Sequence, residues 1–414
     1  MREDRAILAG AGETRYMAEL GRLAGTLGME VVGVLEQGRR DGTGYLGRGK
    51  REELRACVEK VDARFVVTDD ELSASQARVL ERAAGTTVVD RTELIIRIFE
   101  AHARDSASRL EVELADLEYR LPRVKGRNPE LSRLGGGGNI TRGPGEQQLE
   151  YDRRAIRRRI QTINRKLAEE KAARVVRGAR LRRAGPPTVA LVGYTNAGKT
   201  TILNALSGAG RSTKDRLFET LETTTRLVEG SGANGDGKVA RPDIVVTDTV
   251  GFIRKLPTQL VHSFASTLEV SSEAEVNVLC ADASSEVLEE EIQTVIQTLS
   301  ETLPNGSRPG STILCLNKMD LVPEEREAEL RRAYPEAVMI SAIEGCEALL
   351  EEIYSCVSSG RERMEVFIPH AEYAAASRLF GTAEIHAQKS TEAGLWMDVS
   401  LPRSASDRYA PYRV

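Results

Sequence analysis

The sequence predicts an α/β protein in four parts, and three observations support this prediction. Short β-branched runs alternate with helical patterns over residues 1–92, a glycine-rich loop follows an apolar strand near residue 193, and two long stretches carry single apolar stripes. A chain of 414 residues is too long for one compact core. We therefore expect a small parallel α/β subdomain over 1–92, a helical hairpin over 93–184, a second α/β domain over 185–359 and a small α+β tail over 360–414.

Composition is typical of a globular protein. Charged residues make up 29% of the chain and apolar residues 41%, and no apolar run approaches the roughly 20 residues that a membrane helix needs. The first residues, MREDRAILAG, lack the apolar core of a signal peptide. The five cysteines (57, 280, 315, 346 and 356) form no C-x-x-C pair, so we expect neither a disulfide framework nor a zinc site. These features predict a cytoplasmic protein without a membrane segment, and we expect it to be monomeric.

The first 92 residues read as a small parallel sheet. The expected strands are RAILAG, MEVVGVL, RFVVT and TTVVD, and the expected helices are 14–27, 49–60 and 73–84. Strands that alternate with helices indicate parallel pairing with right-handed crossovers. Gly44 to Lys50 (GYLGRGK) matches part of a phosphate-binding motif, but Arg51 stands where a metal-binding hydroxyl is needed. We interpret it as a basic loop before a helix.

Two long helices are expected next. One runs from about Thr92 to Leu121, with leucines 110, 114, 117 and 121 on one stripe, and the other from about Glu146 to Arg183. Apolar residues 149, 156, 160, 163 and 167 of the second helix recur with the 3.5-residue period of a coiled-coil seam. Two such helices in series should fold back as an antiparallel hairpin.

The hairpin also has the composition of a nucleic-acid-binding surface. From Arg153 to Arg183 there are 13 Lys or Arg and two Glu, a local net charge of 13 − 2 = +11, whereas the whole chain carries −4. The loop over 122–146 mixes glycines with arginines, which suits close backbone approach to phosphates. A solvated helix face and a flexible spacer are the alternative interpretations. The candidate RNA contacts are Gly135, Gly136, Gly137, Gly138, Asn139, Arg142, Gly143, Arg153, Arg154, Arg157 and Arg158.

Residues 193–200 read GYTNAGKT between the apolar run TVALV and the segment TILNAL. This is the spacing of a phosphate-binding loop at a strand-to-helix junction, where backbone N–H groups and the helix dipole face the β-phosphate. Lys199 would neutralise the β- and γ-phosphates, and the Thr200 hydroxyl would ligate Mg²⁺. The residues expected to line this part of the site are Gly193, Tyr194, Thr195, Asn196, Ala197, Gly198, Lys199, Thr200 and Thr201.

Two further segments supply metal and γ-phosphate contacts. The segment FETLETTTR (218–226) is threonine-rich, with Thr220 as the candidate second Mg²⁺ hydroxyl and Thr224 as the alternative. The strand DIVVTDTVGF (243–252) ends in Asp-x-x-Gly, where Asp248 would hold Mg²⁺ through water and the Gly251 N–H would meet the γ-phosphate. The residues expected here are Phe218, Glu219, Thr220, Leu221, Glu222, Asp248, Thr249, Val250 and Gly251.

The motif NKMD (317–320) after the strand STILCL predicts guanine recognition. Asp320 would accept hydrogen bonds from guanine N1 and N2, Asn317 would brace the loop, and the Lys318 stem would cover the base. Adenine lacks those donors, so a buried Asp320 would be left unpaired against ATP. The Ser-Ala pair after the strand AVMI would place a backbone N–H near guanine O6. The expected base contacts are Asn317, Lys318, Met319, Asp320, Ser341 and Ala342. Five segments in this order predict a Ras-like P-loop GTPase domain that binds GTP and GDP.

The expected catalytic residues are Lys199, Thr220 and Gly251, and one familiar group is missing. Ras-type domains carry glutamine directly after Asp-x-x-Gly to orient the attacking water, whereas this chain has Phe252. We therefore expect slow hydrolysis by the protein alone, with a partner or a repositioned loop completing the site. A second hypothesis places K⁺ near Asn196, between the α- and γ-phosphates. Bracing of the loop explains this residue equally well.

These motifs together resemble the HflX family of translation-factor-related GTPases, in the Obg–HflX superfamily. The resemblance covers residues 1 to about 360 and is carried by GGGGNITRGPGEQQLEYDRR, the basic helix after it, GYTNAGKTTILNAL, TLETTTR, DTVGFIRKLP and NKMD. The chain has GEQQLE where the family usually has GETQLE, and LETT where it usually has LDPT. Neither change removes a phosphate or metal ligand.

The resemblance implies a GTPase that binds rRNA of the large ribosomal subunit. It also implies that the hairpin reaches toward the peptidyl-transferase centre and that the nucleotide domain lies near the factor-binding centre. Family members are implicated in splitting stalled ribosomes, notably under heat stress, and some unwind RNA in an ATP-linked manner. A ribosome-assembly or rRNA-remodelling GTPase without splitting activity is the alternative. An RNA-binding protein with a vestigial nucleotide domain is disfavoured because Lys199, Thr200, Asp248 and Asp320 are all present.

Overall fold

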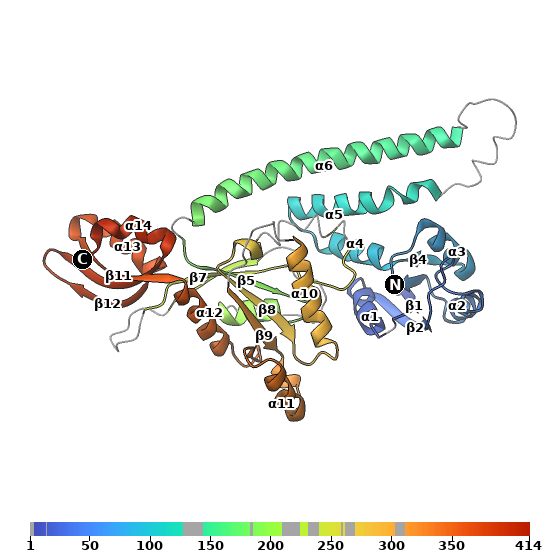
Figure 1. Cartoon of the computed structure of the whole chain (residues 1–414). Helices are drawn as coiled ribbons and strands as arrows, with labels where there is room; N and C mark the ends of the chain where they lie inside the picture. Colours follow the sequence, from blue (N-terminus) through green and yellow to red (C-terminus); the bar gives the residue numbers. More distant parts are fainter. Residues whose placement is uncertain are drawn as a thin grey trace. The chain divides into compact units, whose positions relative to one another are not determined.

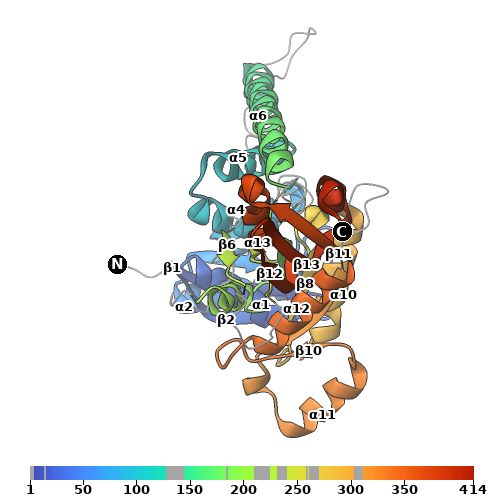
Figure 2. The ribbon, with the colours of Figure 1, turned by 90° about the vertical axis from the view of Figure 1, so that its left-hand side faces the viewer.

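The computed structural model has the α/β architecture that the sequence predicts, with three β-sheets (Figures 1 and 2). It describes residues 4–13, 15–126, 144–182, 185–208, 224–230, 240–257, 260, 270–302 and 311–414. The chain forms two compact units. The first unit comprises residues 1–170, 216–221 and 255–264, and the second comprises 171–215, 222–254 and 265–414.

The first unit contains a parallel four-stranded sheet in the order β2-β1-β3-β4. Its strands are β1 (Asp4–Ala11), β2 (Met29–Gln37), β3 (Phe65–Thr68) and β4 (Thr87–Val89), joined by α1 (Met17–Thr26), α2 (Arg48–Val61) and α3 (Ala74–Ala84). Leu54 of α2 and Leu80 of α3 pack in one core with Ile7 and Val66 of the strands. The predicted strands and connecting helices are therefore present.

The expected single helix over 92–121 is wrong, because the structure has two helices there. Helix α4 (Arg91–His102) ends before Ala103, which has an extended backbone, and α5 (Ser106–Arg120) begins after Asp105. The Asp105 carboxylate accepts hydrogen bonds from the backbone N–H of Ala107 (2.7 Å) and of Ser108 (2.9 Å). This N-cap satisfies donors that a continuous helix would have bonded internally, and it starts a new helix.

The second predicted helix is α6 (Pro144–Arg182), which runs beside α5 in the opposite direction (Figures 1 and 2). Arg159 of α6 makes a two-pronged ion pair with Glu113 of α5, at 2.6 and 2.7 Å. Ile163 on the predicted apolar seam is fully buried. Within the described residues, no helix is both long and apolar enough to cross a membrane.

Buried charges gather at the carboxyl end of the first sheet, between β1 and β3, where the strand order reverses. The Arg91 side chain is 1% exposed and pairs with Asp69 (2.7 Å) and with Glu19. The Lys255 ammonium pairs with the same Asp69 (3.1 Å) and with Asp70 (2.6 Å). Each acidic side chain of this cluster thus has a basic partner.

The second unit contains a six-stranded sheet in the order β10-β9-β8-β5-β7-β6. Its strands are β5 (Thr188–Gly193), β6 (Thr224–Val228), β7 (Ile244–Asp248), β8 (Val276–Asp282), β9 (Ser311–Asn317) and β10 (Val338–Met339). All neighbours pair parallel except β6, which is antiparallel to β7. The helices are α7 (Lys199–Leu206), α10 (Leu288–Thr302), α11 (Glu324–Ala333) and α12 (Glu347–Ser359).

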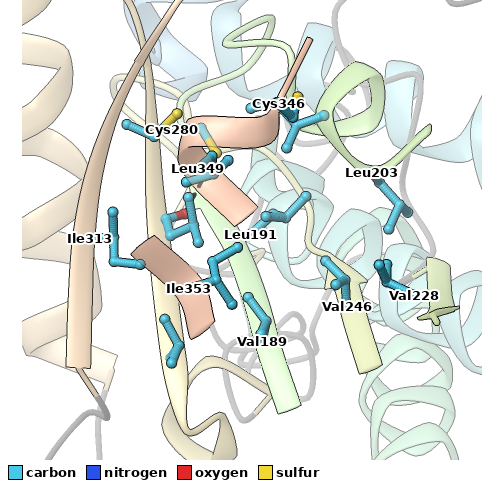
Figure 3. Close-up of a cluster of buried hydrophobic side chains, with 14 of the residues drawn as sticks. Val189, Leu191, Leu203, Val228, Val246, Cys280, Ile313, Cys346, Leu349 and Ile353 are labelled. Atoms are coloured by element: carbon cyan, nitrogen blue, oxygen red, sulfur yellow. Dashed lines mark hydrogen bonds between the residues drawn. The ribbon is translucent and has the colours of Figure 1, made fainter. Parts of the chain in front are cut away.

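The core of this sheet is shown in Figure 3, where side chains of the strands meet those of α7 and α12. Leu191 of β5 is fully buried, as are Leu203 of α7 and Leu349 of α12. Strand β5 lies between β7 and β8 in the sheet. The loops that follow β5 and β7 are therefore neighbours at the carboxyl ends of these strands. In parallel sheets ligands bind at such an edge.

The C-terminal tail forms a third sheet in the order β11-β13-β12. Its elements are β11 (Arg361–Pro369), α13 (Tyr373–Thr382), β12 (Glu384–Ser390), β13 (Gly394–Pro402) and α14 (Arg403–Tyr409). The alternation of the tail sequence predicts two or three strands and one helix, whereas the described tail has three strands and two α-helices. The last residues form an antiparallel bridge from Arg413 to Val366 of β11, so the strand order is that of a ferredoxin-like unit whose fourth strand is a single bridge.

Candidate nucleotide site

The phosphate loop follows β5 and is anchored to the segment that follows β7. The Thr195 N–H donates to the Phe252 carbonyl (2.7 Å), the Phe252 N–H donates to the Gly193 carbonyl (3.0 Å), and the Arg254 N–H donates to the Tyr194 hydroxyl (2.8 Å). These three bonds keep the loop next to the Asp-x-x-Gly turn. The two segments that the sequence assigns to the phosphates are therefore adjacent.

Lys199 begins α7 and points back into the loop. Its ammonium donates to the carbonyls of Gly193 (3.2 Å) and Tyr194 (2.9 Å) and is buried. Burial lowers the pKa of Lys199, and the charge of Asp248 opposes that shift. A triphosphate would supply the negative charge that favours the ammonium form, so this lysine is suited to an anionic ligand.

The residues expected to hold Mg²⁺ meet at the end of β7. The Thr200 hydroxyl donates to the Asp248 carboxylate at 2.7 Å, and Asp248 is fully buried. A hydroxyl and a carboxylate are hard oxygen ligands of the kind that Mg²⁺ prefers. The donor set therefore fits the metal. Thr224 is the first residue of β6, and residues 218–222, including Thr220, lie outside the described part of the chain.

The residues expected to recognise the base come together at the ends of β9 and β10. The Asn317 amide donates to the Ala197 carbonyl (2.9 Å) and accepts from the Ala342 N–H (3.0 Å), while the Ser341 hydroxyl donates to the Asp320 carboxylate (2.8 Å). The Asn317 amide thus links the phosphate loop to the segment that follows β10. The Ala342 N–H already has a partner within the protein, so its contact with guanine O6 stays a prediction.

Sequence reasoning missed Asp282, the last residue of β8. One of its carboxylate oxygens pairs with the Lys318 ammonium at 2.7 Å, and the other accepts from the Ser284 N–H (3.0 Å) and hydroxyl (2.6 Å). Lys318 has a φ of 65°, a conformation that residues other than glycine rarely adopt. The only signal for Asp282 is an acidic residue at a strand end, which is too common to single out.

Phe252 occupies the place of the missing glutamine and is only 4% exposed. Its backbone is bonded to the phosphate loop on both sides, and its ring supplies no hydrogen-bond donor. Asn196 lies within the phosphate loop and has a φ of 65°.

The candidate RNA contacts fall into two groups. Those on α6 are Arg153, Arg154, Arg157 and Arg158, whereas Gly135–Gly138, Asn139, Arg142 and Gly143 lie outside the described residues.

Three family models match consecutive parts of the chain. Residues 14–100 match a GTP-binding GTPase N-terminal region, residues 102–180 a GTP-binding GTPase middle region, and residues 188–318 a 50S ribosome-binding GTPase. Together these matches cover most of the first 318 residues. The phosphate loop, the Asp-x-x-Gly turn and Asn317 and Lys318 all fall inside the third match.

Curated relatives agree with these models. A GTPase HflX of Caldanaerobacter subterraneus is 45% identical over 77% of this chain and 72% of its own length. A GTPase HflX of Gluconacetobacter diazotrophicus is 36% identical over 93% of this chain and 91% of its own. A solved GTP-binding protein of Sulfolobus solfataricus in complex with GDP is 20% identical, covers 86% of this chain and 99% of its own, and has a TM-score of 0.45, too low to bear on function. The phosphate loop, the base-recognition residues and the identity to the curated relatives lead to one conclusion: the chain belongs to the HflX family of GTPases and hydrolyses GTP.

Proposed function

We propose that this GTPase binds the large ribosomal subunit through rRNA in the cytoplasm and hydrolyses GTP there to split or rescue stalled ribosomes under stress. The basic face of α6 carries the proposal. Arg157 and Arg158 are exposed, and neither has an acidic partner within the described residues. Arginines without acidic partners are available to phosphates, and the +11 segment would release counterions on binding RNA. The 50S ribosome-binding family model over residues 188–318 supports the same partner.

In this proposal GTP binding favours docking and hydrolysis favours release. Lys199 would bind the β- and γ-phosphates, and Asp320 would select guanine. Thr200 and Asp248 would hold Mg²⁺, which when bound neutralises charge on the phosphate oxygens. Because Phe252 supplies no amide, the ribosome would complete the site by ordering a group near the γ-phosphate. We also propose that Asn196 helps to hold K⁺, which comparison of hydrolysis rates in potassium and in sodium would test.

The decisive experiment measures GTP hydrolysis with and without purified large subunits, together with sedimentation of whole ribosomes. We expect stimulation by large subunits and conversion of whole ribosomes to subunits. Stimulation without conversion would favour the alternative, a ribosome-assembly or rRNA-remodelling GTPase. Neither stimulation nor co-sedimentation would contradict both.

The basic face can be tested separately. Arg157→Gln with Arg158→Gln should weaken binding to large subunits and reduce the salt slope of log affinity by about 0.7–0.9 for each phosphate that the variant no longer neutralises. Arg55→Gln on α2, whose arginine is exposed and paired with Glu59, is the matched control. Equal slopes for the original protein and both variants would show that α6 does not contribute to the interface.

We further propose that the chain has four modules, over residues 1–92, 93–184, 185–359 and 360–414. Because the second module is separate from the nucleotide domain, deleting Gly135–Gly145 should leave GTP affinity unchanged.

A further inference from the structure

The Thr195 hydroxyl is a buried group without a hydrogen-bond partner among the described residues. Thr195 is 7% exposed, and its Oγ1 atom is buried. A buried hydroxyl that makes no hydrogen bond costs folding free energy, and native proteins usually avoid it. Such groups are explained when a ligand supplies the missing partner. The residues around Thr195 indicate the class of ligand.

Thr195 lies where the γ-phosphate contacts converge. A Cβ atom placed on Gly251 would lie 2.9 Å from the Thr195 Cα, 2.9 Å from its methyl carbon and 3.0 Å from the Lys199 Nζ. Three residues therefore surround one point, and two of them, Lys199 and Gly251, are those that the motifs assign to the γ-phosphate. The methyl group of Thr195 packs against Gly251, and the bond from its N–H to the Phe252 carbonyl fixes its backbone. The side chain is thus held beside the two residues that are expected to contact the γ-phosphate.

We propose that the Thr195 hydroxyl donates a hydrogen bond to a γ-phosphate oxygen of GTP. During hydrolysis water attacks the γ-phosphorus, the bond to the β–γ bridging oxygen breaks, and GDP and inorganic phosphate are released. Negative charge in the transition state is spread over the γ-oxygens, where a fixed donor in a dry site is effective. Phe252 offers no donor there, so the Thr195 hydroxyl would stabilise charge on the γ-oxygens, while the orientation of the attacking water still depends on another group. The inference rests on GTP hydrolysis and is independent of the proposed ribosomal partner.

Thr195→Val tests this because it removes the hydroxyl and keeps the shape. In single-turnover assays without ribosomes, we expect hydrolysis to slow by about 10- to 100-fold. GDP, which has no γ-phosphate, should bind within about twofold of the original affinity. The melting temperature of the nucleotide-free protein should stay the same or rise, because valine removes an unpaired buried hydroxyl. Thr195→Ser, which keeps the hydroxyl, should retain most of the rate.

The matched control is Thr247→Val on β7. Thr247 is also buried, but its hydroxyl is bonded to the Thr225 hydroxyl at 3.0 Å. This control should leave hydrolysis unchanged and lower the melting temperature. The proposal is overturned if Thr195→Val hydrolyses GTP at the original rate. It is also overturned if Thr195→Val weakens GDP and GTP binding equally, since that outcome describes a structural residue of the loop, or if Thr195→Ser is as slow as the valine variant.

Discussion

The four-stranded and six-stranded sheets both have buried polar side chains at the carboxyl ends of their parallel strands, but these side chains find different partners. In the first sheet Arg91 pairs with both Asp69 and Glu19, and the Lys255 ammonium supplies a second positive charge to Asp69. In the second sheet the Lys199 ammonium donates to two neutral carbonyls, and the Thr195 hydroxyl has no partner within the described residues. The same place in the fold is therefore structural in one sheet and a binding site in the other. Matched charges distinguish the first, and polar groups suited to an anion distinguish the second.

The largest expected effect comes from breaking the matched cluster. Arg91→Met removes the guanidinium from buried Asp69 and Glu19 and should lower the free energy of unfolding of the first unit by about 3–5 kcal/mol. Hydrogen exchange of β1 and β3 measures this change. GDP affinity should stay within about twofold of the original. Arg55→Met, which breaks an exposed pair with Glu59, should cost less than about 1 kcal/mol. A parallel fall in GDP affinity would mean that the first sheet is not purely structural.

In the second sheet a substitution should lower nucleotide affinity more than it lowers stability. Gly198 has a φ of +87°, and a Cβ there would lie 2.2 Å from the Asn317 amide nitrogen. Gly198→Ala should therefore displace Asn317 and weaken GTP and GDP binding by more than about 100-fold, roughly 3 kcal/mol. Nucleotide titration measures this.

Gly208→Ala is the matched control for that change. Gly208 also has a positive φ, +63°, but nothing lies within 4 Å of a Cβ there. It should cost about 1 kcal/mol of stability and leave nucleotide affinity unchanged. If both variants bind nucleotide equally well, the contact with Asn317 does not matter for binding.

A smaller effect should sharpen the comparison, because the pair of Asp282 and Lys318 is matched in charge yet belongs to the binding site. Asp282→Ala should free the Lys318 side chain and weaken GDP binding by about 10-fold. A double-mutant cycle with Lys318→Ala decides the cause. If Asp282 acts through Lys318, the Asp282→Ala change should have almost no further effect on GDP binding in the Lys318→Ala protein. An undiminished effect there would assign Asp282 to the stability of the Ser284 turn.

The smallest expected effect lies in the C-terminal sheet, where the buried carboxylate of Asp398 pairs with the exposed guanidinium of Arg363. A hydrogen bond from Arg363 holds the pKa of Asp398 below its ordinary value of 3.8. A carboxyl with a lowered pKa stabilises the fold above its unfolded pKa, and this contribution is lost as pH falls through the folded pKa. Asp398→Asn should therefore lower the melting temperature by about 1 °C near neutral pH and by nothing at low pH. Trp396, the single tryptophan, lies on the same strand and reports the transition by fluorescence.

Sequence reasoning predicted the sheets and the nucleotide loops because their signals are local. Glycine spacing, a lysine before a hydroxyl and a carboxylate at a strand end follow from backbone geometry and phosphate chemistry. The sequence analysis did not predict the break at Ala103, because the leucine stripe from Leu110 favoured one continuous helix. The pair Asp105-Ser106 is itself a helix-start signal. Asp282 and the unpaired Thr195 hydroxyl could not be predicted, because their roles depend on partners that only the folded chain brings near.

The Asn317 amide has a consequence for how the nucleotide is bound as a whole. One side chain contacts the phosphate loop at Ala197 and the base loop at Ala342. GDP then resembles a bivalent ligand, because guanine and diphosphate are two binding groups joined by the ribose. Asn317 would hold their two binding loops at a fixed spacing. Binding of one group to its loop raises the effective concentration of the other group at the second loop. The affinity of GDP should therefore exceed what guanosine and pyrophosphate reach separately, and that excess should disappear in Asn317→Ala.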